Sequence, residues 1–349
     1  MDLLQTGEVS VIQHIQTSFN GLQGYLNFMS TVGDIRTAFL VYFPLCFFID
    51  RRVGTKMVWA LVVGDWINLM FKWVLFGHRP YWWVHETHMY SNDSTPELKQ
   101  FPITCETGAG SPSGHAMGSS CVWYVMVSAF LASRMLPKQS YRYAKFPLWT
   151  MFCIIQVSVC ISRLFVAAHF PHQVILGAVA GVLVAEYFEH VHFIHTAALR
   201  RYVCAALLLF LSAFGFYLFL RILGIDLLWS VDIARKWCAR PEWVHLDSSP
   251  FAGLMRNLGI LLGLGLALSF TSSQGPLYSQ YSTLFFRLVC ISASILVINF
   301  FDSFPLPSQS ELLFYTVIFL KSTAIPLIAV ALIPYFVQNL IGDFDKKHA

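Results

Sequence analysis

Long apolar runs separated by short polar segments make up most of the chain from residue 28 to residue 336. A helix needs about 20 mostly apolar residues to cross a bilayer. Nine runs fit this requirement: 28–49, 55–76, 116–136, 148–167, 173–190, 202–222, 253–271, 284–301 and 312–336. The first is the least regular, because Asp34 and Arg36 interrupt its start. The pattern predicts an all-α polytopic membrane protein of about nine transmembrane helices, with residues 1–349 as one domain in the lipid bilayer.

The composition agrees with a membrane protein. Hydrophobic residues make up 56% of the chain and charged residues 12%, whereas a soluble domain carries about 25% charged residues. A net charge of +4, with no basic run longer than two residues, argues against a nucleic-acid partner. The cysteines show no zinc-type spacing. Cys105 and Cys238 fall in polar segments and could pair in an oxidising lumen, a point that spacing alone leaves open.

Basic residues in the short connections predict the orientation. Lys and Arg favour the cytosolic side of a membrane protein. The connections after the first, third and fifth spans carry Arg51, Arg52, Lys56, Arg134, Lys138, Arg142, Lys145, Arg200 and Arg201. The opposite, lumenal side then holds the N-terminus, the 77–115 loop, the 168–172 turn and the 223–252 loop. Arg235, Lys236 and Arg240 in the last loop count against this orientation but do not outweigh the rest.

Two short motifs agree with that orientation. Asn92-Asp93-Ser94 is a glycosylation sequon in the predicted lumenal loop, with Asn92 as the acceptor. The tail, Lys346-Lys347-His348-Ala349, resembles the cytosolic dilysine signal that returns membrane proteins to the endoplasmic reticulum. An ordinary basic tail is the alternative. We therefore expect a multi-pass protein of the endoplasmic reticulum membrane with a cytosolic C-terminus.

Lys72 and Arg79 form the first candidate cluster. Ionisable side chains beside membrane spans are costly and are functional candidates. Seven residues are close to two helical turns, so the two cations can share a helix face. A guanidinium matches phosphate oxygens, and an ammonium adds a point charge. Alternatively, both side chains extend from the membrane edge into water.

The segment Gly110-Ser111-Pro112-Ser113-Gly114-His115 opens the third span. Small residues let backbone N–H groups approach an anion, and a helix N-terminus favours negative charge. Ser113 can add a hydroxyl donor. His115 is placed to give a proton to a leaving oxygen. A flexible turn with an incidental histidine is the alternative.

Arg163 and His169 form the third cluster, with His169 six residues after the arginine. His169-Phe170-Pro171-His172 interrupts the apolar run and predicts a tight lumenal turn. Arg163 would complete the set of phosphate-binding cations, and His169 is a candidate nucleophile that would form a phospho-histidine. We interpret His172 as structural.

Together the three segments resemble the signature motifs of the phosphatidic acid phosphatase type 2 (PAP2) and vanadium haloperoxidase superfamily. Those motifs run Lys-six residues-Arg-Pro, Pro-Ser-Gly-His, and Ser-Arg-five residues-His-three residues-Asp. The resemblance implies a PAP2-like helical core in which phosphate is bound by Lys72, Arg79, Ser113, Gly114 and Arg163. It also implies His115 as general acid, His169 as nucleophile, and chemistry that uses no metal and no cofactor.

One position departs from the superfamily pattern. Gln173 stands where the superfamily has the Asp that orients the nucleophilic histidine. A neutral amide stabilises a charged imidazole less well than a carboxylate does, so another carboxylate is expected to take this role. Asp34, at the lumenal start of the first span, is our candidate, and Asp65 is a weaker one.

Longer stretches resemble the glucose-6-phosphatase catalytic subunit family over essentially the whole chain. They run from Gly64 to Trp66, Phe71 to Trp73, Phe76 to Val84, Cys105 to Gly108, Ala168 to Gln173, Pro241 to His245 and Pro250 to Ala252. That family also shows Gln at position 173. Two segments, Met1-Asp2 with Ile12-Gln13-His14 and the run from Ser119 to Tyr124, look most like its islet-specific branch. The resemblance implies hydrolysis of glucose 6-phosphate at the lumenal face, supplied by a glucose-6-phosphate translocase.

Other functions stay open at this point. A lipid phosphate or polyprenyl diphosphate phosphatase would use the same chemistry but needs an apolar entrance from the bilayer. The aromatic residues of the 77–115 loop suit either sugar stacking or a membrane-interface belt. A transporter or binding protein would not need two histidines in the acid and nucleophile positions. Because these histidines must start in opposite protonation states, we expect activity to fall on both sides of a pH optimum.

Overall fold

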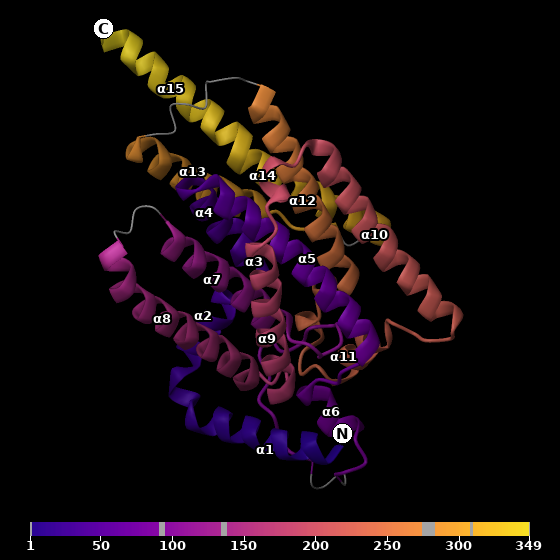
Figure 1. Ribbon diagram of the computed structural model, residues 1–349. Coiled ribbons are helices and arrows are strands. Elements are labelled where there is room, and N and C mark those ends of the chain that lie inside the picture. The colour runs from indigo at the N-terminus through magenta and orange to yellow at the C-terminus, as the bar shows by residue number, and fades with distance from the viewer. Residues whose placement is uncertain (1, 91–94, 134–137, 274–282, 308–309, 349) are drawn as a thin grey trace. The chain divides into compact units, whose positions relative to one another are not determined.

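The computed structural model describes residues 2–90, 95–133, 138–273, 283–307 and 310–348, and the regular secondary structure of these residues is helical (Figure 1). The predicted acceptor Asn92 lies outside the described residues. The longer helices are α1 (Asp2–Ser18), α2 (Gln23–Val32), α5 (Arg51–Leu75), α7 (Gly114–Ala132), α8 (Lys138–Phe165), α9 (Pro171–Glu189), α10 (Leu199–Ile222), α12 (Pro250–Ser273), α13 (Leu284–Asp302), α14 (Glu311–Leu327) and α15 (Ile333–His348). The shorter ones are α3 (Ile35–Thr37), α4 (Phe43–Ile49), α6 (Pro80–Glu86) and α11 (Trp229–Trp237).

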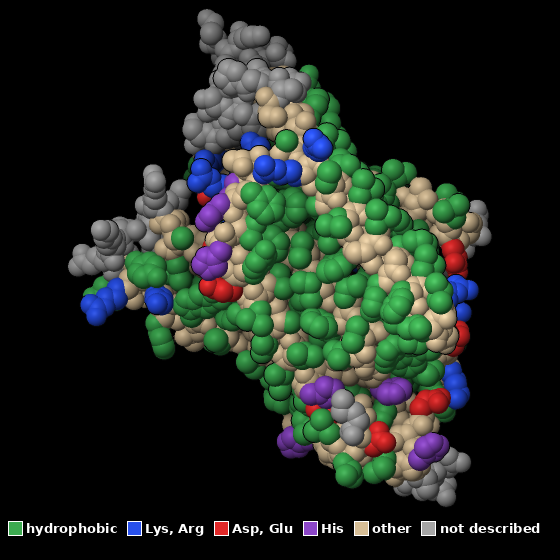
Figure 2. Space-filling model, turned by 45° about the vertical axis from the view of Figure 1, so that its right-hand side comes forward, with side chains coloured by type: hydrophobic (Ala, Val, Ile, Leu, Met, Phe, Trp, Pro, Cys, Tyr) green, Lys and Arg blue, Asp and Glu red, His purple; other side chains and the backbone are tan. Residues whose placement is uncertain are grey.

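The helices confirm the predicted all-α membrane architecture. Eight helical stretches in the described part of the chain are long and apolar enough to cross a membrane, and a broken pair brings the number to as many as nine. Large apolar side chains remain exposed on these helices; Leu208 and Leu211 of α10 are 68% and 61% exposed. Hydrophobic side chains cover most of the face drawn in Figure 2. This is the surface expected of a multi-pass membrane protein, because lipid replaces water around the spans.

The broken pair is the first predicted span, 28–49. α2 ends at Gly33, and the chain continues after Asp34 as α3, a π-helical turn (Ala38–Tyr42) and α4. A Cβ on Gly33 would lie 2.7 Å from Cγ1 of Val159, so glycine permits the close approach of α8 at this break. The polar interruption noted in the sequence therefore marks a real break in the helix.

The chain divides into two compact units. The first consists of residues 1–35, 63–187 and 213–253, and the second of residues 36–62, 188–212 and 254–349. All the candidate site residues lie in the first unit.

In the first unit, glycines bring α9 close to α7. A Cβ on Gly181 would lie 2.1 Å from the carbonyl oxygen of Met117, and one on Gly177 would lie 2.5 Å from that of Ser113. Two small residues four positions apart are a common way for membrane helices to approach closely. The contact sets Ser113, just before α7, beside the first turns of α9.

The N-terminal helix α1 packs against the end of α8. Its apolar residues Val9 and Ile12 are buried. Gln16 donates from Nε2 to the carbonyl oxygens of Phe165, at 2.7 Å, and Lys99, at 2.9 Å. The N-terminal segment is thus a packed helix that supports the turn after α8.

The second unit uses the same small-residue packing. A Cβ on Gly263 of α12 would lie 2.2 Å from the carbonyl oxygen of Thr323, and one on Gly259 would lie 2.5 Å from that of Phe319, both in α14. Lys56 and Glu189 form an ion pair of 2.6 Å in this unit. No predicted catalytic residue belongs to it.

Candidate active site

The three sequence clusters meet at one place in the first unit. Lys72 lies in the last turn of α5 and Arg79 directly precedes α6. Ser113 caps α7, which begins with Gly114 and His115. Arg163 lies in the last turn of α8, and His169 in the turn before α9. The predicted residues that come together around a common centre are Arg79, His115, Arg163 and His169, and Lys72 lies beside Gly108 at the edge of this cluster.

A carboxylate that the motifs do not contain, that of Glu106, lies at this centre. Its Oε2 is 2.8 Å from Nη1 of Arg79, and its Oε1 accepts a hydrogen bond from Nη2 of Arg163. Oε1 is also 3.6 Å from Nδ1 of His115, and Oε2 is 3.8 Å from Nε2 of His169. Burial would raise the pKa of the Glu106 carboxyl, but the two guanidiniums outweigh it and hold this pKa well below its usual value. Glu106 is therefore ionised at neutral pH.

Arg79 is fully buried and is held mainly by backbone carbonyls. Its Nε donates to Gly108 at 2.7 Å, and its Nη1 donates to Ala168 at 3.1 Å. These carbonyls come from the loop before α7 and the turn before α9, so the side chain joins both segments. The fixed guanidinium fork faces Glu106 and the imidazole of His169.

Arg163 is also fully buried. Nη1 donates to Oγ of Ser30 in α2 at 2.7 Å, while Nε is buried without a hydrogen-bond partner in the described part of the protein. Nε2 of His115 is unpartnered in the same sense. Buried polar atoms without partners are rare in proteins and mark places where a ligand or water completes the hydrogen bonding.

The hydrogen bonds of His169 define its tautomer. Nδ1 lies 2.8 Å from the carbonyl oxygen of Gly110, which can only accept, so Nδ1 carries the proton. Burial lowers the pKa of His169 well below its usual value, and the charge of Arg79 lowers it further. The imidazole is therefore neutral, and the lone pair of its Nε2 accepts a hydrogen bond from Nη1 of Arg79 at 3.4 Å.

A backbone carbonyl lies at Nδ1 of His169, and the orienting role predicted for Asp34 stays a prediction. The partner of the His169 imidazole is the Gly110 carbonyl, whereas Asp34 lies within electrostatic range of His115 and Arg163. A sequence pattern of side chains does not indicate which backbone carbonyl will accept a hydrogen bond.

Comparison with known proteins identifies the family. The PAP2 superfamily pattern matches residues 53–197. Glucose-6-phosphatase 2 of Homo sapiens and of Mus musculus are each 54% identical to the chain over 356 aligned residues, covering 99% of both chains. Glucose-6-phosphatase catalytic subunit 1 of Canis lupus familiaris is 47% identical, covering 99% of this chain and 98% of its own. This chain belongs to the glucose-6-phosphatase family. No solved structure matches it.

Gln173, the position at which this family member departs from the wider superfamily motif, has a structural role. Its Nε2 donates to the carbonyl oxygen of His78 at 2.7 Å, and its Oε1 accepts from the backbone N–H of Phe170 at 3.1 Å. The amide thus connects the segment before Arg79 to the turn that carries His169. An Asp could make only the second of these bonds, since a carboxylate does not donate.

The N-terminus of α7 supplies the remaining predicted phosphate-binding residues. Ser113 is fully buried, and its Oγ accepts from the backbone N–H of Ala116 at 3.4 Å. Asn68 donates to the carbonyl oxygen of Pro112 at 3.2 Å and so fixes the entry to the helix. With Ser113 occupied as the cap, the N–H groups of the first turn and the dipole of α7 are the groups offered to an anion.

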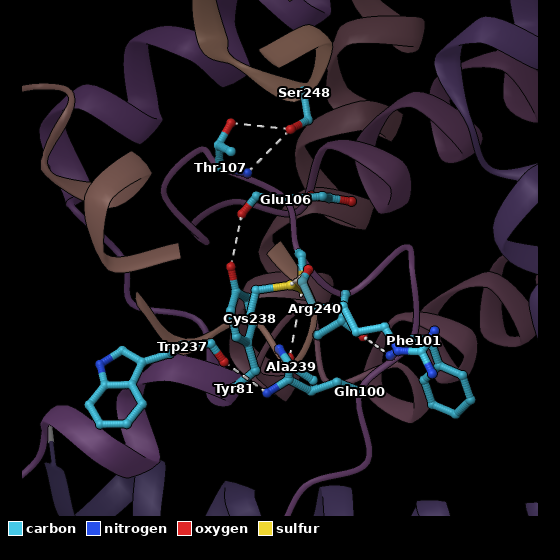
Figure 3. Close-up of a disulfide and its surroundings, with 12 residues drawn as sticks. Tyr81, Gln100, Phe101, Glu106, Thr107, Trp237, Cys238, Ala239, Arg240 and Ser248 are labelled. Carbon is cyan, nitrogen blue, oxygen red and sulfur yellow. Dashed lines mark hydrogen bonds between the residues drawn. A yellow bond between two sulfur atoms is a disulfide. The ribbon is translucent and has the colours of Figure 1, made fainter. Parts of the chain in front are cut away.

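A segment distant in sequence holds the Glu106 loop (Figure 3). Cys105 and Cys238 form a disulfide, which answers the question that their spacing left open. Ser230 of α11 donates to the carbonyl oxygen of Thr107 at 2.8 Å, and Oγ of Ser248 lies 3.1 Å from Oγ1 of Thr107. The predicted lumenal loops 77–115 and 223–252 are thereby joined on both sides of Glu106.

No group of three or more His, Cys, Asp or Glu side chains suited to a metal ion occurs among the residues described here. The ionisable groups of the site pair with one another instead. This arrangement can bind an anion between two guanidiniums, present a neutral imidazole as nucleophile, and place a second imidazole next to the same position.

Proposed function

We propose that this protein hydrolyses glucose 6-phosphate to glucose and phosphate through a phospho-histidine intermediate. The observation that carries the proposal is the convergence of Arg79, Arg163, His115 and His169 on one anionic group, the Glu106 carboxylate. A site that holds one anion between two buried guanidiniums suits the dianion of a phosphate monoester. The printed names of the relatives, glucose-6-phosphatase 2 and glucose-6-phosphatase catalytic subunit 1, supply the substrate.

In the proposed reaction, Nε2 of His169 attacks phosphorus while the bond from phosphorus to the sugar oxygen breaks. His115 gives its proton to that oxygen, and glucose leaves. A water molecule then attacks the phospho-histidine and passes a proton to His115. Phosphate and the free imidazole of His169 are regenerated, so no other reactant is required.

The phosphate-binding roles follow from charge and geometry. Arg79, Arg163 and Lys72 would neutralise the oxygens of the transferred group, and the N-terminus of α7 at Ser113 and Gly114 would add backbone donors. Phosphoryl transfer depends mainly on such positioning and charge stabilisation. The buried, unpartnered Nε of Arg163 supports this assignment, because a bound oxygen would satisfy it.

The proposed location is the endoplasmic reticulum membrane, with the active site lumenal and the C-terminus cytosolic. The Cys105–Cys238 disulfide supports a lumenal position for both loops, since disulfides persist in oxidising compartments. Substrate made in the cytosol must then cross the membrane. We therefore propose functional coupling to a glucose-6-phosphate translocase.

Phosphate release from glucose 6-phosphate by the full-length protein purified in detergent tests the function. We expect release by the wild-type protein, none by His169→Ala, and an unchanged rate for His88→Ala, a matched change at an exposed histidine outside the site. A lipid phosphate and a polyprenyl diphosphate are assayed in parallel. Release from these alone would assign the protein to the lipid-directed alternative, and release from no substrate would contradict catalysis.

The intermediate is tested separately by quenching the wild-type protein in alkaline denaturant after mixing with substrate labelled on phosphorus. Label that is stable to base, labile to acid and absent from His169→Ala is expected for a phospho-histidine. Turnover without such label would exclude the proposed nucleophile while leaving the hydrolase assignment intact.

A further inference from the structure

Glu106 occupies the position that the proposed chemistry requires for phosphate. Its two oxygens contact Arg79 and Arg163, one oxygen each, as two oxygens of a bridging phosphate would. Phosphorus must come within about 3–3.5 Å of the attacking atom in a productive complex. Oε2 of Glu106 is 3.8 Å from Nε2 of His169, so the carboxylate and the phosphoryl group cannot share this space.

The electrostatics lead to the same exclusion. Glu106 is ionised, and a phosphate monoester brings up to two further negative charges to the same two guanidiniums. Like charges at such short range repel strongly where water is largely excluded. The carboxylate side chain is 18% exposed, whereas both guanidiniums are fully buried. Glu106 is therefore the member of the cluster with a route away from it.

The arginines do not depend on Glu106 alone for their placement. Arg79 has its bonds to the carbonyls of Gly108 and Ala168, and Arg163 has its bond to Ser30. These contacts would hold both guanidiniums in position after the carboxylate has left. The site can thus exchange one anion for another without being rebuilt.

The backbone on either side of Glu106 is fixed to the 223–252 loop. Cys105 is bonded to Cys238, and Thr107 is hydrogen bonded to Ser248 (Figure 3). Ser230 donates to the carbonyl oxygen of Thr107. The backbone N–H of Thr107 also lies 3.3 Å from Oγ of Ser248. These bonds return the side chain to the same site each time an anion leaves, while leaving its own torsions free.

We propose that Glu106 is an internal competitor for the phosphate subsite: it fills the subsite in the free protein, is displaced by a phosphate ligand, and returns as that ligand leaves. The inference rests on the proposed function only in assigning Arg79 and Arg163 to phosphate. Its consequence is weaker binding and faster release of the product phosphate. Glu106 is a residue that sets affinity, and it takes no part in the bond-making steps.

The test is equilibrium binding of labelled orthophosphate to the full-length protein in detergent. Glu106→Gln keeps the shape of the side chain and removes its charge. We expect its Kd for orthophosphate to be about tenfold lower than that of the wild-type protein, because the competing charged hydrogen bonds are lost. Glu97→Gln, at an exposed carboxylate of the same loop, should leave Kd unchanged. An unchanged or higher Kd for Glu106→Gln would mean that Glu106 is a permanent counter-ion, and the proposal would be wrong.

A second variant covers the case in which Glu106→Gln does not fold. Ser248→Ala removes hydrogen bonds to Thr107 and leaves every charge in place. Because Glu106 is then held less firmly, we expect a Kd for orthophosphate about two- to threefold lower. An unchanged or higher Kd contradicts the proposal here too.

The binding assay separates this inference from the proposed function. Tighter binding of orthophosphate by Glu106→Gln, without phosphate release from glucose 6-phosphate by the wild-type protein, would support this inference and contradict the proposed function. Hydrolysis by the wild-type protein, together with an unchanged Kd for orthophosphate in Glu106→Gln, would support the proposed function and contradict this inference.

Discussion

His169 donates its Nδ1 hydrogen to the carbonyl oxygen of Gly110 across 2.8 Å, although the two residues are 59 positions apart in the sequence. This bond fixes the proton on Nδ1 and leaves Nε2 unprotonated, with its lone pair facing Nη1 of Arg79. A backbone carbonyl thus does what a carboxylate does in the wider superfamily motif. A neutral acceptor stabilises the charged imidazole less than a carboxylate would, so the position of this carbonyl matters for the proposed nucleophile.

Gly110→Ala is expected to move that carbonyl. An added Cβ would lie 2.6 Å from the carbonyl oxygen of His78 and 2.9 Å from Oε1 of Gln173. The backbone at 110 must shift, and a misplacement of about 1 Å in a catalytic group can cost on the order of 100-fold in rate. We expect kcat to fall by about that factor. Gly118→Ala in α7, where an added Cβ meets no atom within 4 Å, should leave kcat unchanged.

The pH dependence follows from the direction of the His169 shift. Burial and Arg79 hold the pKa of His169 well below its usual value, so the nucleophile stays deprotonated, and active, as the pH falls through about 6.5. We expect the acid limb of kcat/KM to lie clearly below that pH. An acid limb centred at the ordinary histidine pKa would contradict the environment described for His169.

The unfolded chain takes up a proton on this histidine below about pH 6.5 and loses it on folding, so acid also favours unfolding. The folded fraction must therefore be measured at every pH.

Removing the Cys105–Cys238 disulfide should weaken the link between the two loops around Glu106. The bond closes a loop with a sequence separation of 133 residues. Loss of a native disulfide costs about 2–5 kcal/mol in small secreted domains. We expect Cys238→Ser to have a lower thermal unfolding temperature than the wild-type protein. Wild-type protein treated with reductant should show the same decrease. Cys204→Ser, at an exposed free cysteine, is the matched control and should unfold as the wild type does. An unfolding temperature of Cys238→Ser equal to that of the control would show that the hydrogen bonds of Thr107 suffice.

The sequence predicted the convergence of the motifs because each motif has a spacing that reports local geometry. Ser113 precedes a helix, as its chemistry predicts. The shared helix face expected for Lys72 and Arg79 is wrong, because α5 ends at Leu75 and Arg79 has extended backbone before α6. The position of Arg163 in the last turn of a span and of His169 in the following turn came from the apolar pattern. Residues of these kinds can be found from one sequence.

Glu106 and the Gly110 carbonyl could not be found in the same way. Glu106 has no fixed spacing to either arginine. Its contact with Arg163 joins residues 57 positions apart and forms only when the chain folds. A backbone carbonyl has no signature in a sequence at all. The motif comparison looked for a side-chain carboxylate, whereas the Nδ1 hydrogen bond of His169 goes to the backbone of Gly110. The stretch from Cys105 to Gly108, noted for its family resemblance, was the available signal for Glu106.

Gly181→Ala should test the packing that sets α7 beside α9. The new Cβ would lie 2.1 Å from both the Met117 carbonyl oxygen and Oγ of Ser120. The backbone of Met117 cannot shift without disturbing the packed helix pair, and overpacking of this kind destabilises a protein by about 1–3 kcal/mol. We expect a lower unfolding temperature and a reduced kcat, since α7 carries His115. Gly215→Ala in α10 has no atom within 4 Å of its new Cβ and should unfold as the wild type does. Equal unfolding temperatures for the two variants would argue against close packing at Gly181.

Glu8→Gln tests whether α1 supports the turn that carries His169. Glu8 lies 2.7 Å from Nδ1 of His172 through Oε2, and its Oε1 accepts from the backbone N–H of His172 at 3.0 Å. His172 stacks on Phe170, one residue after His169. A glutamine retains one acceptor but loses the charge, so we expect about 1–2 kcal/mol less stability and a several-fold lower kcat with KM little changed. His172→Ala, which removes the partner instead, should give the same kcat loss, and the double variant should lose no more than either single variant. Additive losses would mean that Glu8 acts on the turn by another route.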